Sequence, residues 1–356
     1  MSPQNQQEEV SGQRLAPFRR VPAAIRVAKA APSRKRGTLA FKFGGSSLLG
    51  AERMLHAAGL VRAAARISPV VTVVSAMKGT TDKLLGVANA IAEGKLERAR
   101  GDAARILDQH LAVLEDLALA EELCARVKRE LLLLGDDLLH IEPLSPSAAV
   151  SGEVFDRLAS FGERFSARLF AGALEKCGVT AVPVASSDFV VTCDTFRDAR
   201  PRLEQTRERG AAVLRPLLDD GIVPVVTGFI GATEDGRITT LGRNSSDFSG
   251  AIIAHVVDAD ELVIWTDVDG IYTANPRESS EACLLHELSY DEAHALAAAG
   301  AKVLHADVLP LAAETQMVVW VRNTFNPQSR GTRISANRAP RKRQLEASAS
   351  REGDRG

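Results

Sequence analysis

The sequence predicts an α/β fold, in the form of a three-layer αβα sandwich around a mainly parallel sheet. Short, continuous runs of β-branched and other apolar residues, such as residues 69–75, are typical of strands that are covered on both faces. These runs mostly alternate with stretches of helical periodicity, as in parallel strands joined by crossover helices. With 356 residues, of which 45% are hydrophobic and 25% charged, the chain is large enough to bury such a core.

Two strand–loop–helix units are expected first. Residues 38–43 (TLAFKF) form the first strand, and the helical pattern after it places apolar residues on one side, namely Met54, Leu55, Ala58 and Val61. Residues 69–75 (PVVTVVS) form the second strand and residues 82–91 the second helix. Residues 95–139 are rich in Ala, Leu, Glu and Arg and carry no strand signal, so we expect two or more inserted helices that form a substrate-side lobe.

A long helix is expected over residues 152–176. Apolar residues recur there at spacings of 4, 3, 4 and 4, and Gly178 follows as a stop signal. Further strands are expected at residues 179–184, 189–192, 221–230, 261–265 and 317–321. Further helices are expected at residues 211–218 and 251–257.

Two short motifs predict local structure. Asp235-Gly236 predicts a tight turn that opens a hairpin with residues 237–241. Ser289 and Glu292 have the S-x-x-E spacing of a capping box, which predicts a helix that begins there and ends at Gly300.

The charge distribution is uneven, although the net charge is −1. Residues 1–37 hold eight Lys and Arg against two Glu, and residues 333–356 hold seven against three acidic residues, so residues 38–332 carry −11. We expect two disordered basic tails around one folded domain. An anion bound by this acidic domain must be held by a few positioned cations and backbone N–H groups. The aromatic content of 4% is too low for the stacking platforms of single-strand binders, so no nucleic-acid partner is expected.

The spacing of the cysteines and the length of the apolar segments indicate the cellular compartment of the protein. The four cysteines lie 53, 16 and 90 residues apart, which fits neither a C-x-x-C pair nor a short disulfide framework, so we expect buried free thiols. No apolar stretch approaches the ~18 residues of a membrane span, and residues 1–10 lack the apolar segment of a secretory signal. We therefore expect a cytoplasmic protein without a membrane partner.

Chemistry-bearing residues gather directly after the predicted strands, where ligands bind in open parallel sheets. They are Lys42, Gly44, Gly45, Ser46, Ser47, Ser75, Lys78, Thr227, Gly228, Phe229, Gly231, residues 241–247 and residues 265–270. Small residues let the backbone approach a phosphate, and a helix that begins near Ser246 directs free N–H groups at an anion. These positions predict a phosphate-handling edge of the sheet.

Several of these residues also have a structural interpretation. Lys42 fits a turn with an exposed lysine, Arg243 fits a surface ion pair, and Asp247 taken alone fits a helix cap. For Asp269, within Asp-Val-Asp-Gly, a turn role is favoured. The planar fork of Arg243 suits a carboxylate or phosphate, and the agreement among the loops favours a functional Lys42.

Common nucleotide and metal signatures are absent from the sequence. It contains no G-x-x-x-x-G-K-[ST], no G-x-G-x-x-G after a strand and no paired-histidine metal spacing, so we predict no metal-ligating residue set. A carboxyl group with a pKa of about 4 is ionised at neutral pH and needs no general base. A kinase that acts on a carboxylate therefore fits these residues.

With these motifs in view, the chain resembles the catalytic domain of aspartokinases, members of the amino acid kinase family, across residues 38–332. The blocks that carry the resemblance are KFGGSS (42–47), FGERFSA (161–167), VVTGFIG (225–231), TTLGRNSSDFSGA (239–251), IWTDVDGIYTANPR (264–277), LSYDEA (288–293), GAKVLH (300–305) and VRNTFNPQSRGT (321–332). KFGGSSL and GRNSSDFS look especially like the kinase part of bifunctional aspartokinase–homoserine dehydrogenases. The resemblance implies the amino acid kinase fold, ATP and Mg²⁺ as cofactors, and phosphorylation of the side-chain carboxylate of L-aspartate, the first step towards lysine, threonine and methionine.

The resemblance also implies roles for single residues. Lys42 would offset charge on the transferring group, and Asp247 would order the site as its second catalytic residue. Residues implied to bind the nucleotide are Gly44, Gly45, Thr266, Asp267, Tyr272, Arg277 and Lys302. Residues implied to bind aspartate are Ser46, Ser47, Ser75, Glu163, Arg243 and Ser246. Periodicity alone makes Glu163 a solvated glutamate opposite the apolar stripe of its helix, whereas the motif implies a site residue.

The chain departs from the family in three places. Ser245 stands where members commonly carry glycine, and it is strained if that backbone needs a positive φ. Ala306 replaces the usual proline after His305. Only 24 residues follow Thr332, too few for the paired ACT domains of aspartokinases, so we expect no ACT domain and no ACT-mediated inhibition by lysine or threonine.

Two other functions stay open from the sequence. One is a relative that phosphorylates another acidic amino acid or a small phosphate ester, and the other is a catalytically weak regulatory subunit. The resemblance is also compatible with a homo-oligomer or with a separate regulatory or dehydrogenase partner.

Overall fold

The computed structural model describes residues 37–140, 151–242, 245–274, 279, 281–298 and 304–336. Its main sheet has eight strands in the order β10-β12-β11-β7-β1-β2-β4-β3. Their bounds are β1 (Leu39–Phe43), β2 (Val70–Val74), β3 (Ala181–Val184), β4 (Val223–Thr227), β7 (Glu261–Thr266), β10 (Glu287–Leu288), β11 (Val318–Asn323) and β12 (Thr332–Ile334). All neighbours pair in parallel except β11 with β12, which confirms the mainly parallel sheet.

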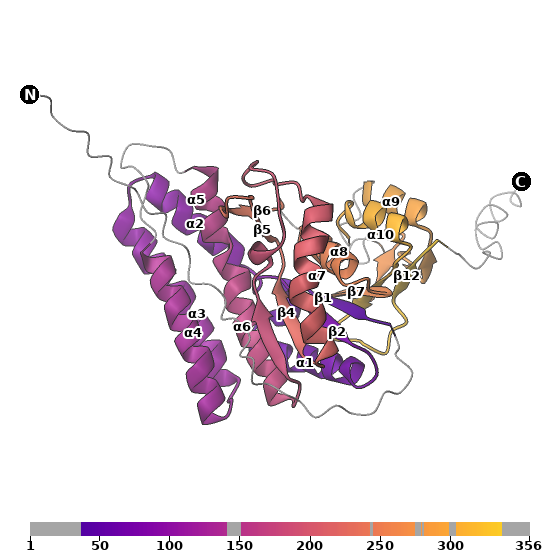
Figure 1. The fold of residues 1–356 in the computed structure, drawn as a ribbon, viewed down its shortest axis with the longest axis horizontal. Coiled ribbons are helices and arrows are strands. Elements are labelled where there is room, and N and C mark those ends of the chain that lie inside the picture. The colour runs from indigo at the N-terminus through magenta and orange to yellow at the C-terminus, as the bar shows by residue number, and fades with distance from the viewer. Residues whose placement is uncertain are drawn as a thin grey trace, which may run out of the picture.

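Helices cover both faces of this sheet (Figure 1). The core of one face contains residues of α1 (Ala51–Ala65), α2 (Thr80–Ala92), α3 (Leu96–Asp116), α4 (Glu121–Leu139), α5 (Gly152–Ala159) and α6 (Phe161–Lys176). The core of the other contains residues of α7 (Leu203–Asp219), α8 (Ser246–Val256), α9 (Tyr290–Ala298) and α10 (Val308–Thr315). Along β1, Phe41 and Phe43 join the first core and Ala40 joins the second, as the two-residue period of a strand requires. The three-layer sandwich is confirmed.

The inserted helices α3 and α4 run side by side at one end of the molecule (Figure 1). Helix α4 packs on α6, and α3 packs on α2. Two inserted helices were therefore predicted correctly from the lack of a strand signal between residues 95 and 139.

The helix expected over residues 152–176 is instead two helices, α5 and α6, which meet at Ser160. The Ser160 hydroxyl donates to the carbonyl oxygen of Arg157 at 2.7 Å, a local bond that bends helices. The strand expected at residues 189–192 is also wrong. Val191 and Thr192 form only isolated bridges, to Ala232 and Pro201, after the 3₁₀ turn η2 (Ser186–Asp188). Their apolar side chains are buried by packing and not by a strand ladder.

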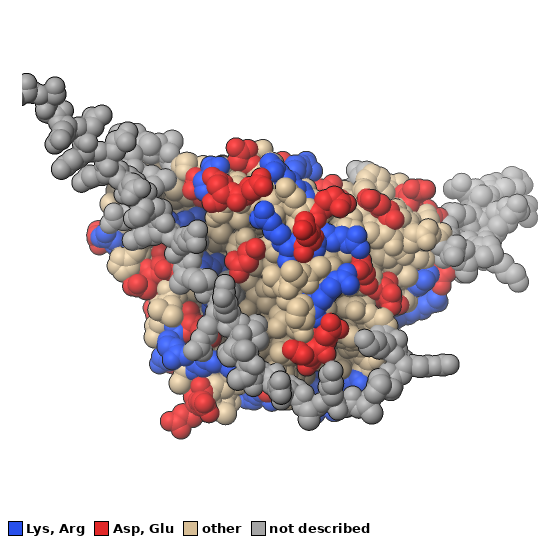
Figure 2. Space-filling model, in the orientation of Figure 1, with Lys and Arg blue, Asp and Glu red and all other residues tan. Residues whose placement is uncertain are grey.

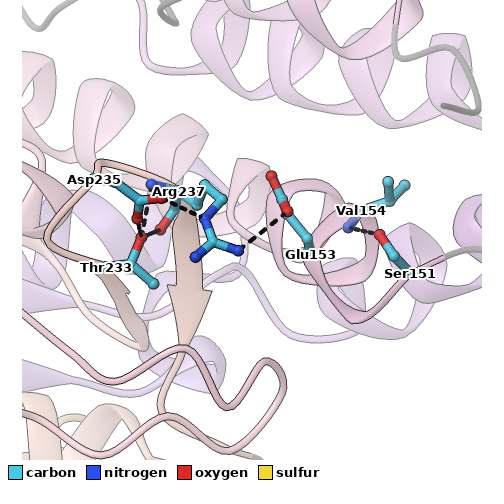
Figure 3. A network of polar contacts seen from close by, with 6 residues as sticks. All are labelled: Ser151, Glu153, Val154, Thr233, Asp235 and Arg237. Carbon is cyan, nitrogen blue, oxygen red and sulfur yellow. Dashed lines mark hydrogen bonds and ion pairs between the residues drawn. The ribbon is translucent and has the colours of Figure 1, made fainter. Parts of the chain in front are cut away.

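The predicted hairpin forms between β5 (Ile230–Ala232) and β6 (Ile238–Thr240), which pair antiparallel. In its turn, Arg237 Nε donates to Asp235 Oδ2 at 2.9 Å, and Arg237 Nη1 lies 3.8 Å from Glu153 Oε2 of α5. Figure 3 shows this contact joining the turn to the first turn of α5, where Ser151 caps the Val154 N–H at 3.4 Å. The hairpin is thus tied to the helix beside it.

The capping box is confirmed at α9. The Ser289 N–H donates to Glu292 Oε2 at 2.9 Å, and the Glu292 N–H donates to the Ser289 hydroxyl oxygen at 3.1 Å. Gly300, the expected end of this helix, lies outside the described residues. The short elements η1 (Gly45–Leu48), β8 (Ile271–Tyr272) and β9 (Leu284–Leu285) complete the described structure.

The four cysteines are free, but they are less buried than expected, since three are half-buried and Cys283 is exposed. Within the described ranges, the helices are too short or too polar for any of them to traverse a bilayer.

Candidate active site

A cavity of about 840 Å³ opens where β1, β2 and β7 end. Its wall includes Gly45 and Ser46 after β1, Ser75 and Ala76 after β2, and Asp267 after β7. Strand β1 lies between β2 and β7, so the strand order reverses there, and such switch points are where open parallel sheets bind ligands. The predicted position of the site is therefore the position of the main cavity in the described part of the chain.

Lys42 is buried and paired, not an exposed turn lysine. Its side chain projects from β1 on the α8 side of the sheet, is 7% exposed, and brings Nζ to 2.6 Å from Asp247 Oδ1. Gly250 makes room for this approach, because a Cβ there would lie 3.1 Å from the Cβ of Lys42. Asp247 lies in the first turn of α8, where the free N–H groups of the helix also favour negative charge.

At the edge of the sheet that was predicted to bind phosphate, the loops after β1 and β2 and the start of α8 are in contact. The Lys78 N–H donates to the carbonyl oxygen of Gly45 at 3.1 Å, which joins the loops after β1 and β2. The Ser75 hydroxyl donates to the Ser246 hydroxyl oxygen at 2.9 Å, which joins the second loop to the start of α8. The expected helix start at Ser246 is thus confirmed, and its free N–H groups lie at the cavity.

We expect Gly45→Ala to lower the melting temperature by several degrees, because a Cβ there would lie 2.5 Å from the Ala76 carbonyl oxygen and 3.0 Å from the Lys78 nitrogen. Overpacking against backbone typically costs about 1–3 kcal/mol. Thermal unfolding measures the effect. Gly44→Ala is the matched control, because a Cβ at Gly44 finds nothing nearer than 3.7 Å. Equal melting temperatures for the two variants would contradict the close approach at Gly45.

Glu163 is a buried carboxylate in the cavity wall. It is 3% exposed, and Oε1 accepts the Ala76 N–H at 3.0 Å, while the buried Oε2 has no hydrogen-bond partner among the described residues. Burial raises the pKa of Glu163 to about 8, although the Ala76 N–H and the Lys42 charge oppose the shift. The periodicity argument fails here because residues 161–174 of α6 are all buried, so no face of that stretch reaches solvent.

The predicted site residues fall into three groups. Those that line the cavity are Lys42, Gly45, Ser46, Ser75, Glu163, Ser246, Asp247, Thr266 and Asp267. Those outside its wall are Gly44, Ser47 and Tyr272. Those outside the described residues are Arg243, Arg277 and Lys302.

The three residues outside the wall differ from the expectation for physical reasons. The Ser47 hydroxyl is fully buried against the Thr324 hydroxyl, 2.7 Å away, so it holds the loop in place and does not face the cavity. The Gly44 N–H donates to the carbonyl oxygen of Trp265 at 3.2 Å, and so extends the β1–β7 pairing. Tyr272 pairs with Leu284 in the small β8–β9 sheet.

Two further expectations are corrected. Ser245 has a φ of −78° and donates its hydroxyl to the Gly242 carbonyl oxygen at 2.7 Å, so the expected strain is absent; Gly242 takes the positive φ, 86°. The α3–α4 insertion is not a substrate-side lobe, because none of its residues lines the cavity. The contact that the structure gives Asp269 is a long-range one, since it accepts from the Asn323 side-chain amide at 2.7 Å.

Sequence reasoning missed several residues of the wall, among them the charged residues Asp82, Asp156 and Arg197. Asp156 lies in α5, whereas Glu163 lies in α6 after the bend at Ser160. Arg197 comes from an irregular loop, and no sequence pattern marks it.

The distribution of charge on the surface agrees with the expectation that a few cationic side chains, and not a broad positive field, would hold an anion. Figure 2 shows basic and acidic side chains interspersed over one face, with no broad field of one sign. The cations of the cavity wall in the described residues are Lys42, Lys78 and Arg197. Across those same residues, no group of three or more His, Cys, Asp or Glu is arranged to hold a metal ion.

The chain is similar to several known proteins. A model of the amino acid kinase family matches residues 37–323. Aspartokinase 1, chloroplastic, of Arabidopsis thaliana is 35% identical over 85% of this chain and 52% of its own length, and lysine-sensitive aspartokinase 3 of Escherichia coli is 34% identical over 82% and 63%. The structure of E. coli aspartokinase III with aspartate and ADP matches with a TM-score of 0.72 and 31% identity, covering 85% of this chain and 65% of that one. The chain thus spans between about half and two thirds of the length of these curated relatives.

Proposed function

The chain belongs to the amino acid kinase family, and from this premise we propose that it transfers the γ-phosphoryl group of ATP to the side-chain carboxylate of L-aspartate. The observation that carries the proposal is the buried, unpartnered Oε2 of Glu163, in one cavity with the Lys42–Asp247 pair. A cation site and an anion site in one open cavity suit an amino acid and a phosphate chain. The aspartokinase relatives support the choice of aspartate.

In this proposal, a side-chain carboxylate oxygen of aspartate attacks the γ-phosphorus, and the bond from that phosphorus to the β–γ bridging oxygen breaks to release ADP. Phosphoryl transfer needs positioning and charge neutralisation more than covalent help. Lys42 offsets the charge on the transferring group, and Asp247 holds the Lys42 ammonium in place while no phosphate is bound. The N–H groups of the Gly45 loop and of the start of α8 hold phosphate oxygens.

The nucleotide is proposed to lie against Thr266 and Asp267 after β7, with Arg277 and Lys302 from the family resemblance. Aspartate is proposed to place its ammonium on Glu163 and a carboxylate on Arg243, with the hydroxyls of Ser46, Ser75 and Ser246 nearby. Glu163 supports the ammonium site because a cation there would pair the free Oε2 and stabilise the ionised carboxylate.

The donor set of the cavity fits Mg²⁺ carried on the phosphates. This ion commonly uses one or two carboxylates together with substrate phosphates and water, and the wall supplies Asp247 and Asp267. These two residues would hold the ion, which when bound supplies further neutralisation of phosphate charge.

A hydroxamate trap for acyl phosphates tests the proposal. With ATP, Mg²⁺ and L-aspartate, we expect aspartyl hydroxamate to accumulate in proportion to ADP. L-glutamate and N-acetyl-L-glutamate tried side by side separate aspartate from other acidic substrates. A protein that folds and binds ATP but forms no hydroxamate with any of the three would contradict the proposal and favour a regulatory subunit.

We also expect aspartate binding to release protons near pH 7. The pKa of about 8 keeps Glu163 mostly protonated in the free protein at this pH, and pairing with the substrate ammonium lowers that pKa. Titration calorimetry in two buffers of different ionisation enthalpy measures the release. A binding enthalpy that is the same in both buffers would show that Glu163 does not receive the ammonium.

A further inference from the structure

Arg197 has a left-handed backbone, with a φ of 72°. It lies in the loop between η2 and α7. A residue with a Cβ seldom adopts this conformation, because the Cβ crowds the backbone, and such strain persists only where the surrounding structure holds it. Strained residues of this kind cluster at binding and catalytic sites.

The buried carboxylate of Asp156 holds this strained backbone. Asp156 is 2% exposed, and its Oδ2 accepts the N–H of Arg197 at 2.8 Å and the N–H of Thr240 at 2.9 Å. Its Oδ1 accepts the Thr240 hydroxyl at 2.8 Å. One carboxylate therefore joins helix α5, the Arg197 loop and the end of the β5–β6 hairpin, whose turn is tied to α5 a second time through Arg237 and Glu153 (Figure 3). The point from which the Arg197 side chain projects is fixed.

Arg197 is exposed and belongs to the cavity wall. Its guanidinium carbon lies 4.9 Å from the centre of the Phe155 ring, and Phe155 lines the same cavity. Stacking on an aromatic face orients a guanidinium and leaves the N–H groups at its edge available to a ligand. In the described ranges of the chain, this guanidinium has no hydrogen bond and no ion pair, so its N–H donors are not used by the protein, while its charge opposes the rise in the pKa of Asp156 that burial causes.

Arg197 and Glu163, the proposed ammonium site, belong to the wall of the same cavity. Asp156 and Ala159 of α5 and Glu163 of α6 all line the cavity. A small amino acid held at Glu163 therefore shares one cavity with Arg197.

We propose that Arg197 is a specificity-determining residue that binds the α-carboxylate of the amino acid substrate. The inference rests on the proposed function and deepens it. A planar guanidinium pairs with a carboxylate through two parallel hydrogen bonds, which favours substrates with a free carboxylate next to the ammonium. The strained backbone and its support by Asp156 present this guanidinium to the cavity.

The test compares Arg197→Gly with the wild type on two substrates, L-aspartate and its α-amide, which lacks the α-carboxylate. Glycine accepts the left-handed backbone, so the variant is expected to keep at least the wild-type melting temperature. We expect the KM for aspartate to rise at least tenfold, with kcat and the KM for ATP within twofold of wild type. With the α-amide, the variant and the wild type are expected to have KM values within threefold of each other. Arg197→Lys should recover part of the affinity.

Arg200→Ala is the matched control, because Arg200 lies in the same loop but outside the cavity wall, and it should leave both KM values unchanged. A KM for aspartate within twofold of wild type in Arg197→Gly would overturn the inference while the proposed function stands. An equal loss on both substrates would also overturn it, since the effect would then be indirect. A wild type that neither turns over nor binds aspartate in calorimetry would overturn the proposed function, and this inference with it.

Discussion

Replacing Lys42 with methionine is expected to lower kcat for aspartate phosphorylation by roughly 10³-fold, with a smaller change in the KM for ATP. Removing one preorganised donor to transition-state charge typically costs about 10²–10³ in kcat, and Lys42 also carries a full charge in a buried site. Methionine keeps the length and apolar stem of the side chain, so the strand packing is retained. Steady-state kinetics with the hydroxamate or ADP readout measures the change.

The Lys42–Asp247 ion pair needs its own control, because Lys42→Met leaves the Asp247 carboxylate without its partner at 2.6 Å. The double variant with Asp247→Asn removes that lone charge and is expected to regain thermal stability but not kcat. If the double variant recovered activity, the loss in the single variant would come from the stranded carboxylate and not from a missing phosphate contact. Activity of Lys42→Met within tenfold of wild type would remove Lys42 from the mechanism.

Glu163→Gln is expected to raise the KM for aspartate about 100-fold. The variant keeps the Ala76 contact through its amide oxygen but replaces the free carboxylate oxygen with an amide group that repels an ammonium. A buried hydrogen bond to a charged group contributes about 1.5–3 kcal/mol, which corresponds to roughly one to two powers of ten. Kinetics at fixed, saturating ATP measures the change, and the KM for ATP is the internal control.

The same substitution weakens aspartate binding but is expected to stabilise the fold at high pH. The pKa of Glu163 is raised from 4.5 to about 8 in the folded chain, so the stability linked to its protonation is fully present below pH 4.5 and is lost as the pH rises through about 8. Glutamine stays neutral at every pH. Without ligand, Glu163→Gln should therefore unfold at a higher temperature than wild type at pH 9, and the difference should shrink towards pH 5. A constant difference across this range would show that Glu163 titrates normally.

The sequence predicts the strands of the sheet well where burial alone determines them. Residues 69–75 and 261–265 are continuous apolar runs that the sheet covers on both faces, and β2 and β7 agree with them within a residue or so. The capping box and the Asp-Gly turn are local signals, and both form as expected. Helix α10 was missed because it is short and its apolar residues are not confined to one stripe.

The site was predictable only in part, for reasons of distance along the chain. Lys42, Gly45 and Asp247 stand at strand ends or a helix start, so the topology of a parallel sheet brings them together. Glu163 needed the family resemblance, because periodicity treats each helix as a surface helix. Arg197 depends on a hydrogen bond from Asp156, 41 residues earlier, and no local pattern reports such a contact. Hydrogen bonds between residues far apart in the sequence, such as that between Asp156 and Arg197, are visible only in the three-dimensional structure.

The residues of the cavity wall are spread along the chain from Lys42 to Asp267. No single segment of the sequence supplies most of them. The site therefore comes into being only when β1, β2 and β7 have met, late in the assembly of the sheet, because joining strands so far apart costs loop-closure entropy first. Ligand binding therefore stabilises only the fully folded chain. A ligand at 100 times its dissociation constant adds about 2.7 kcal/mol to the free energy of unfolding of the native state, and it adds nothing to a partly folded state that lacks the site.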